Sequence, residues 1–216
     1  MAAKLKGIWV FGASIVYGAY DSRGGWVQRL RTYLDSKGFD ERGKYYCEIY
    51  NLGIPKGETS SDLNSRILSD AKPRVWDAER ICLISIGVND SALWTDKVGN
   101  WVSLDEYRSN LKEIIQKART FSREVCFIGI TPVDESWTNP IPWDLRFSYK
   151  NSEIEKYNQA MKDVATECSV GFIDLLPEIV GAKWNDMLRD GVHPNDEGHE
   201  LIYQIVRKEL EKQGII

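Results

Sequence analysis

Short apolar segments alternate along this chain with longer segments in which apolar residues recur every three or four positions. The short segments are rich in Ile, Val, aromatic residues or Cys, a composition typical of buried strands. They predict strands at 7–11, 45–52, 81–86, 125–130 and 171–175. The longer segments predict helices at 26–36, 60–71, 104–122, 154–168 and 196–212.

Strand and helix therefore alternate five times, and this order predicts an α/β fold. Parallel neighbours in a sheet need crossover connections, so we expect a parallel sheet with helices on both faces. In the predicted helix 104–122, Tyr107, Leu111 and Ile114 form an apolar stripe that would pack on this sheet. No repeat or Pro/Ser linker interrupts the pattern, so we expect one domain over residues 1–216.

Composition and charge narrow the possible partners. The chain has 216 residues, of which 43% are hydrophobic and 28% charged, enough for a buried core. Its net charge is -4 and it has no Lys/Arg block, which argues against nucleic acid or an anionic membrane surface as a partner. It has neither a signal-peptide core nor a run of roughly 18 apolar residues. We expect a cytoplasmic protein with a small-molecule partner and no membrane span; a homo-oligomer is compatible with the sequence.

The cysteines and glycines give no sign of a cofactor. Cys47, Cys82, Cys126 and Cys168 are widely spaced without a Cys-x-x-Cys pair, so we expect buried reduced thiols and no metal site. Glycines near the first predicted strand lack the Gly-x-Gly-x-x-Gly spacing of a dinucleotide site. We therefore expect no organic cofactor.

Candidate functional residues follow four of the predicted strands at the ends where parallel sheets bind ligands. Ser14 follows the first strand, Gly53 the second and Asn89 the third, while Asp190 and His193 come after the fifth. Because the carboxyl ends of parallel strands meet at one edge, we expect these five residues to share a site.

The residue types suit nucleophilic catalysis. A serine hydroxyl needs a base to take its proton, and an imidazole titrates near neutrality, which makes Ser14 and His193 a candidate pair. The carboxylate of Asp190 would accept Nδ1–H, fix the tautomer and stabilise the imidazolium. The backbone N–H groups of Ser14 and Gly53 and the side-chain amide of Asn89 would stabilise the oxyanion.

Each of these residues also has an ordinary structural role open to it. Ser14 alone would be read as a helix cap, Asn89 as a turn or cap residue, and His193 as a surface-loop histidine. The second histidine, His199, has no acidic partner at a telling spacing, so we interpret it as structural.

The ordered motifs resemble those of the SGNH, or GDSL-like, hydrolases, whose namesake residues match Ser14, Gly53, Asn89 and His193. The Asp-x-x-His motif of that superfamily matches Asp190 and His193, and the resemblance spans nearly the whole chain. It implies a three-layer α/β/α sandwich of flavodoxin-like type with a five-stranded parallel sheet. It also implies a lipase, esterase or other acylhydrolase that works through an acyl-enzyme on Ser14.

The sequence departs from this superfamily at one position. The first motif usually reads Gly-Asp-Ser, whereas this chain has Gly12-Ala13-Ser14. In relatives the aspartate helps to hold the nucleophile loop through hydrogen bonds, and Ala13 has no group that can do so. The role of triad acid falls to Asp190, so Ala13 would affect the level of activity and not the assignment of the catalytic residues.

Large side chains indicate the character of the site. Several tryptophans lie in segments expected to rim it: Trp94, Trp101, Trp137, Trp143 and Trp184. They either pack under loops or line an aromatic pocket. Three prolines in the long loop after the fourth strand, Pro132, Pro140 and Pro142, favour a fixed wall over a mobile lid. Such a pocket suits short-chain acyl, aryl or acetylated-sugar esters better than long lipids.

Other functions fit part of the pattern. A thioesterase or lysophospholipase would use the same residues. A ligand-binding protein on the same scaffold would explain Ala13 as the result of lost catalysis. A flavodoxin-like module for a phosphate or flavin would leave Asp190 and His193 without a purpose.

Overall fold

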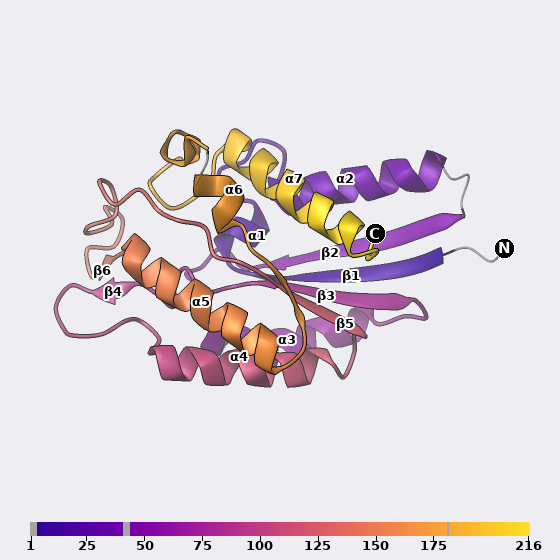
Figure 1. Ribbon diagram of the computed structural model, residues 1–216, viewed down its shortest axis with the longest axis horizontal. Helices are drawn as coiled ribbons and strands as arrows, with labels where there is room; N and C mark the ends of the chain where they lie inside the picture. The colour runs from indigo at the N-terminus through magenta and orange to yellow at the C-terminus, as the bar shows by residue number, and fades with distance from the viewer. Residues whose placement is uncertain (1–3, 41–43, 181) are drawn as a thin grey trace.

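The computed structural model describes residues 4–40, 44–180 and 182–216. Five parallel strands form one sheet in the order β2-β1-β3-β5-β7, and Figure 1 shows β2, β1, β3 and β5 side by side. They are β1 (Lys4–Gly12), β2 (Tyr45–Gly53), β3 (Glu79–Ser85), β5 (Glu124–Ile128) and β7 (Gly171–Ile173). The five predicted strands are confirmed, with ends that differ by a few residues.

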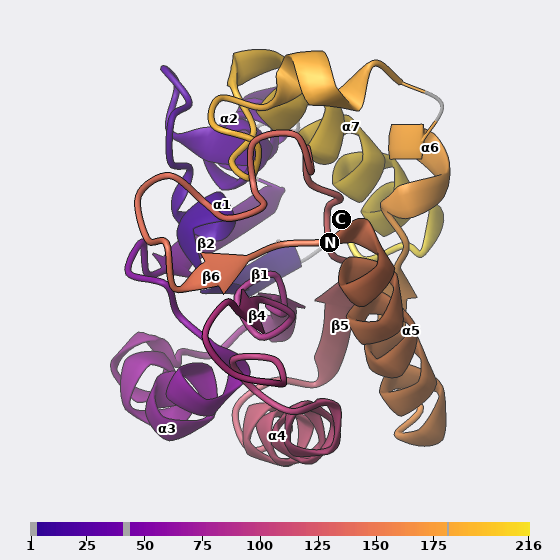
Figure 2. The same ribbon diagram turned by 90° about the vertical axis from the view of Figure 1, so that its left-hand side faces the viewer.

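Helices cover both faces of the sheet and make a three-layer α/β/α sandwich (Figures 1 and 2). One outer layer holds α2 (Gly25–Asp40) and α7 (Asp196–Lys212). The other holds α3 (Ser60–Ala71), α4 (Leu104–Ala118) and α5 (Asn151–Glu167). The strand order reverses between β1 and β3, so the carboxyl ends of these two strands flank the switch point where ligands bind in such sheets.

The central strand β1 shows why the apolar segments are continuous. Side chains alternate between the faces of a strand, and both faces are covered by helices. Ile8 and Val10 belong to the core beneath α2 and α7, whereas Trp9 and Phe11 belong to the core beneath α3, α4 and α5. All four are fully buried.

Local capping explains several helix ends. At the start of α3, the Thr59 side chain accepts the Asp62 N–H and the Asp62 carboxylate accepts the Thr59 N–H, which forms a capping box. Asn195 caps α7 by accepting the N–H groups of its first turn. Both helices have the predicted bounds. Helix α4 ends at Ala118, earlier than predicted, because the next residues form a hydrogen-bonded turn.

Short elements complete the edge that carries the site. They are α1 (Ser14–Tyr17), α6 (Leu176–Val180), β4 (Leu93–Trp94) and β6 (Phe147–Ser148). The antiparallel pair β4 and β6 ties the segment after β3 to the loop after β5. These elements are too short to show a periodic pattern, so the sequence did not predict them.

Three of the four cysteines are buried, as expected, whereas Cys168, at the end of α5, is only half-buried. Cys47 lies in β2, Cys82 in β3 and Cys126 in β5. Burial raises the pKa of Cys47 to about 11 and that of Cys126 to about 12. Their thiols therefore stay protonated at neutral pH and are poor nucleophiles.

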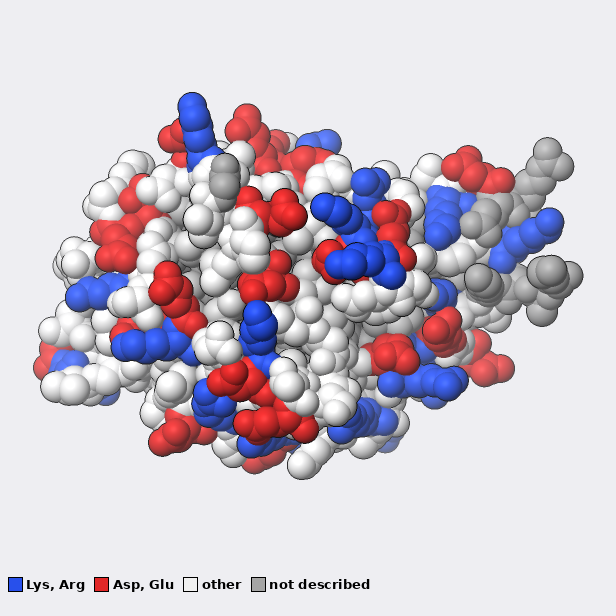
Figure 3. Space-filling model, in the orientation of Figure 1, with Lys and Arg blue, Asp and Glu red and all other residues white. Residues whose placement is uncertain are grey.

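Charged side chains of both signs are interspersed over the face shown in Figure 3. This mixture agrees with the weak net charge of the sequence. Among the residues that the structure describes, no helix combines the length and apolarity needed to cross a membrane.

Candidate active site

A close backbone contact fixes the start of the nucleophile segment. A Cβ atom at Gly12 would lie 2.1 Å from the carbonyl oxygen of Ser85 in the neighbouring strand, so only glycine fits there. The chain then turns, and α1 begins at Ser14. Ser14 is the first residue of this helix, so its backbone N–H has no acceptor within the helix.

Three residues from the two ends of the chain form a hydrogen-bonded series. Ser14 Oγ lies 2.8 Å from His193 Nε2, and His193 Nδ1 lies 2.8 Å from Asp190 Oδ2. A carboxylate only accepts, so Nδ1 carries the proton and Nε2 is free to accept the serine proton. The structure thus brings together the nucleophile, base and acid expected from the sequence.

The Asp190 carboxylate is held by its own turn. Its Oδ1 accepts the backbone N–H groups of Val192 at 3.0 Å and His193 at 2.8 Å. Burial raises the pKa of this carboxyl, but the hydrogen bonds and the charge of His193 outweigh it, and the net effect lowers the pKa of Asp190. Asp190 is therefore ionised at neutral pH and orients the imidazole.

Asn89 is buried beside Ser14 and is held at both ends of its amide. Its Nδ2 donates to the Glu58 carbonyl at 2.8 Å, and its Oδ1 accepts from the Tyr149 hydroxyl at 2.9 Å. These bonds fix which amide atom is nitrogen. The second N–H of the amide has no acceptor among the described residues and is available to a ligand in the cavity that Asn89 and Ser14 both line.

The structure does not support the expected oxyanion role of Gly53. Its N–H donates to the side chain of Asn51 at 3.0 Å, and the backbone of Tyr17 packs so closely that a Cβ at Gly53 would lie 2.2 Å from Tyr17 N. Four residues later, Gly57 has a positive φ of 57° and lines the same cavity as Ser14 and Asn89. Its N–H has no acceptor within the described part of the chain.

A cavity of about 480 Å³ lies over the Ser14, His193 and Asp190 series. Two aromatic rings flank the imidazole: that of Tyr20 is 5.4 Å from the His193 ring and that of Trp143 is 6.0 Å away. The cavity is accordingly walled by aromatic groups on the side of the base.

The other tryptophans expected at the rim have mixed positions. Trp101 lines the cavity and stacks on Phe147, with ring centroids 4.5 Å apart, and Trp94 packs on the same ring at 4.4 Å. Trp184 is buried and donates its indole N–H to a carbonyl of the loop after β5. Trp137 is exposed and lies outside the described lining of the cavity. Some tryptophans therefore pack under loops, as Trp184 does, and others line the cavity, as Trp101 does.

The long loop after β5 is held by many hydrogen bonds. The Thr138 side chain bonds the carbonyls of Asp134 and Tyr149, each at 3.1 Å. The Asp134 N–H donates to the Gly191 carbonyl at 2.8 Å, which links this loop to the turn that carries Asp190. These bonds agree with the fixed wall expected from the prolines.

A second, small cavity of about 30 Å³ lies beside the nucleophile, and Ala13, Ser14, Asn89 and Val192 are among the residues that line it. Ala13 is also the N-cap of α1, and its side chain makes no capping hydrogen bond. The methyl group therefore stands where a short polar side chain would cap the helix that carries Ser14.

Asp90, next to Asn89, is an unusual buried carboxyl. It is fully buried, and its Oδ1 accepts the Ser60 N–H at 2.9 Å, whereas Oδ2 has no partner among the described residues. Burial raises the pKa of Asp90 to about 7. The described residues contain no cluster of His, Cys, Asp and Glu placed to hold a metal ion.

The sequence did not identify Gly57, Tyr20 or Tyr149 as parts of this site. Gly57 lies in the same loop as Gly53, just before the capping box of α3, and a second glycine in that loop was the signal available. The two tyrosines come from loops whose path depends on the folded structure.

Comparison with known proteins gives a consistent result. The sequence profile of the GDSL-like lipase/acylhydrolase family matches residues 10–201. The chain is 26% identical to the isoamyl acetate-hydrolyzing esterase 1 homolog of Homo sapiens, over 94% of this chain and 81% of that protein. It is also 26% identical to a GDSL esterase/lipase of Arabidopsis thaliana, over 96% of this chain and 87% of that protein.

Solved structures show the same fold. A lipase/acylhydrolase from Enterococcus faecalis superposes with a TM-score of 0.72 at 20% identity, over 96% of each chain. Axe2, an acetylxylan esterase from Geobacillus stearothermophilus, superposes with a TM-score of 0.70 at 20% identity, over 97% of this chain and 95% of the other. The three-layer sandwich expected from the sequence is thereby confirmed.

The first prediction concerns Ala13. Replacing Ala13 with Asp supplies the missing cap of α1, so we expect the free energy of unfolding to rise by about 0.5–2 kcal/mol and kcat to rise modestly. Thermal melting and ester hydrolysis of both forms measure the two effects. A loss of both stability and kcat would show that the loop is packed around the methyl group instead.

The second prediction concerns Asp90. Its pKa in the folded state lies above the ordinary value of 3.8, so the free energy of unfolding is highest below about pH 4, falls as the pH rises from about 4 to about 7, and levels off above the folded-state pKa. Relative to Asp90→Asn, the free energy of unfolding of the wild type should fall by up to about 1.4 kcal/mol for each pH unit in this window. Urea unfolding across that range measures it, with exposed Asp105→Asn as control. Parallel curves for wild type and Asp90→Asn would contradict the prediction.

Proposed function

This chain belongs to the GDSL-like lipase/acylhydrolase family, and we propose that it hydrolyses carboxylic esters through an acyl-enzyme on Ser14. Membership makes it a carboxylic-ester hydrolase. One observation carries the proposed mechanism: Ser14 Oγ, the His193 ring and the Asp190 carboxylate form an unbroken hydrogen-bonded series at the floor of the cavity. We further propose that residues 1–216 are a single hydrolase domain, because all the long strands join one sheet.

Acylation begins at Ser14. His193 Nε2 takes the hydroxyl proton as Oγ attacks the ester carbonyl carbon, and a tetrahedral intermediate forms. The ionised Asp190 stabilises the imidazolium through Nδ1–H. His193 then gives its proton to the alcohol oxygen, the bond between that oxygen and the acyl carbon breaks, and the alcohol leaves.

Deacylation repeats these steps with water. His193 takes a proton from the water molecule, whose oxygen attacks the acyl carbon, and returns the proton to Ser14 Oγ as the acid leaves. The products are one alcohol and one carboxylic acid for each ester and water consumed. The residues of this chain end in their starting protonation states.

Three donors around Ser14 suit the developing oxyanion. They are the Ser14 N–H at the start of α1, the second amide N–H of Asn89, and the Gly57 N–H in place of the Gly53 N–H expected from the sequence. The bonds of Asn89 to Glu58 and Tyr149 hold its amide before substrate arrives, so little reorganisation is needed during the reaction.

The geometry favours an ester with a short acyl group and a ring in its alcohol. The cavity of about 30 Å³ beside Ser14 and Asn89 has room for a methyl-sized group. Tyr20 and Trp143 offer aromatic surfaces beside His193. The names of two similar proteins, an isoamyl acetate-hydrolyzing esterase homolog and an acetylxylan esterase, point to acetyl esters. We therefore propose aryl acetates and acetylated sugars as the substrate class.

The third prediction tests the catalytic series. Ser14→Ala and His193→Ala should each lower kcat by roughly 10⁴ to 10⁶, and the double variant should be little worse, because nucleophile and base act as a unit. Ser152→Ala, at an exposed position in α5, is the control. Additive losses would contradict the mechanism. A fluorophosphonate should label Ser14 of the wild type; an unlabelled wild type would favour a ligand-binding protein.

The fourth prediction tests Asn89. Asn89→Ala should lower kcat by about 10² to 10³ with little change in KM, because its free N–H acts mainly in the transition state. It also leaves the Glu58 carbonyl and the Tyr149 hydroxyl unpaired, so the free energy of unfolding should fall by about 1–3 kcal/mol. Tyr149→Phe separates the effects, since it keeps the amide and should retain most of kcat. A change confined to KM would make Asn89 a ground-state binding residue.

A further inference from the structure

Tyr20 has a backbone conformation that is rare for a residue with a side chain. Its φ is 63°, in the left-handed region, and no glycine flexibility accounts for it. Its side chain is 61% exposed, yet the ring lies 5.4 Å from the His193 ring in an edge-on arrangement and lines the catalytic cavity. A strained conformation of this kind persists only where neighbouring contacts impose it.

Both chain neighbours of Tyr20 are anchored to buried side chains. The Ala19 carbonyl accepts a hydrogen bond from His199 Nε2 at 3.2 Å. The Asp21 carboxylate, which is fully buried, accepts from both ends of the Arg29 guanidinium and from the Gly25 N–H. The peptide units on each side of Tyr20 are therefore fixed, and the aromatic side chain between them is directed towards the cavity.

His199 has both ring nitrogens engaged by backbone groups. It is fully buried, and its Nδ1 accepts the Trp26 N–H at 3.3 Å. Nδ1 is then unprotonated, so Nε2 carries the proton and donates to Ala19. Burial lowers the pKa of His199, which favours this neutral tautomer. The sequence predicted a structural role for His199, and the structure shows what it is: His199 holds the Ala19 carbonyl.

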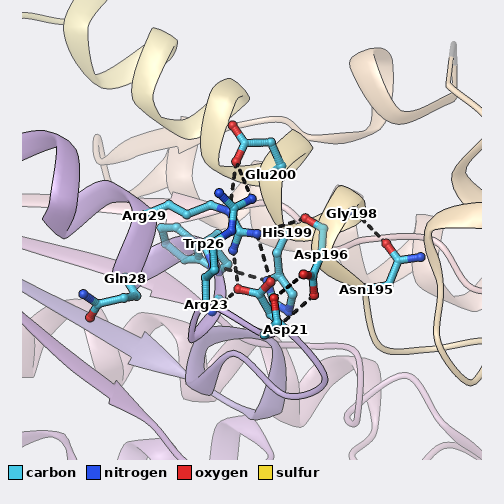
Figure 4. Close-up of polar contacts among 12 residues, drawn as sticks. Asp21, Arg23, Trp26, Gln28, Arg29, Asn195, Asp196, Gly198, His199 and Glu200 are labelled. Atoms are coloured by element: carbon cyan, nitrogen blue, oxygen red, sulfur yellow. Dashed lines mark hydrogen bonds and ion pairs between the residues drawn. The ribbon is translucent and has the colours of Figure 1, made fainter.

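A cluster of partly and fully buried polar side chains joins the Tyr20 segment to the start of α7 (Figure 4). Arg29 donates to Glu200 at 2.9 Å and to the Asp196 carbonyl at 3.1 Å, while the Asp196 carboxylate accepts the Ser22 N–H at 2.9 Å. We call Asp21, Arg29, Asp196, His199 and Glu200 the α7 clamp. Helix α7 begins three residues after His193. The α7 clamp therefore fixes the Tyr20 segment to the same first turn of α7 that follows the catalytic base.

The position of Tyr20 relative to the reaction follows from the path of the proton. His193 must deliver its proton to the leaving alcohol oxygen, so the alcohol lies on the imidazole side of the acyl carbon. Tyr20 borders that side. We propose that Tyr20 determines specificity for the alcohol part of the ester and that the α7 clamp positions it, an inference that rests on the proposed ester hydrolysis.

The test uses two esters with the same acyl group, phenyl acetate and ethyl acetate. The selectivity ratio is kcat/KM for the first divided by kcat/KM for the second. Tyr20→Ala should lower this ratio roughly threefold to tenfold, the loss expected for one aromatic contact, and Tyr20→Phe should preserve it. Tyr17→Ala is the matched control, because Tyr17 is an exposed aromatic of the same segment outside the described cavity lining. An unchanged ratio in Tyr20→Ala would overturn the proposal.

The clamp is tested by a double-variant cycle. His199→Gln keeps a polar group but not the two fixed ring nitrogens, so it should lower the selectivity ratio in the wild-type background and leave it unchanged in Tyr20→Ala. Arg29→Lys removes the guanidinium that donates to both carboxylate oxygens of Asp21, so it should likewise lower the ratio in the wild-type background only. Equal losses of the ratio in both backgrounds, or no loss in either, would overturn the role of the clamp.

Failure of the underlying ester hydrolysis gives a different result. Both acetates form the same acetyl-enzyme, so any effect of Tyr20→Ala on its hydrolysis is equal for the two esters and does not enter the ratio. A fluorophosphonate should label Ser14 in the wild type. A wild type that hydrolyses neither ester and is not labelled would refute the proposed function and this inference with it. Normal labelling and hydrolysis with an unchanged ratio would refute the inference alone.

Discussion

The hydrogen bond between Ser14 Oγ and His193 Nε2 joins residues separated by 179 positions, and its 2.8 Å length depends on the whole sandwich. Ser14 is placed by the close contact of Gly12 with β3, whereas His193 is placed by the turn before α7. These two placements agree only if α7 packs over the same face of the sheet as α2. Polar contacts between the segment after α1 and the start of α7 hold the two catalytic segments in this relative position.

Two buried aspartates near the site show how partners decide the state of a carboxyl. Burial favours a raised pKa in each. Asp21 is paired with Arg29, and its pKa is lowered to about 2, whereas Asp90 has no cation beside it among the described residues, and its pKa is raised to about 7. Asp21 is thus a fixed charge that holds the loop of Tyr20. Asp90 is a neutral or titrating group that anchors the start of α3 beside Asn89.

The fold was predictable because its signals are periodic and repeated. The strand–helix alternation gives the parallel sheet, and the capping residues of α3 and α7 give their bounds. The triad candidates were predictable because Ser14 directly follows the first strand and one of only two histidines, His193, lies three residues after an acid. The choice between Gly53 and Gly57 was not, since it depends on which way a backbone N–H points. That direction is set by the Asn51 contact and by the positive φ of Gly57, which have no counterpart in residue spacing.

The residues that wall the cavity could not be predicted from the sequence for the same reason: residue spacing does not show which side chains meet in the folded chain. An aromatic residue near the active-site motifs can pack under a loop, as Trp184 does, or line the cavity, as Trp143 does, with similar sequence surroundings. Trp184 donates its indole N–H to a loop carbonyl, whereas Trp143 is exposed and lies beside the His193 ring. A catalytic site needs groups held before substrate binds, because reorganisation during the reaction costs free energy. In this chain the hydrogen bonds around His199 and Asp21 would meet that need on the proposed alcohol side, as those of Glu58 and Tyr149 to Asn89 would on the proposed oxyanion side.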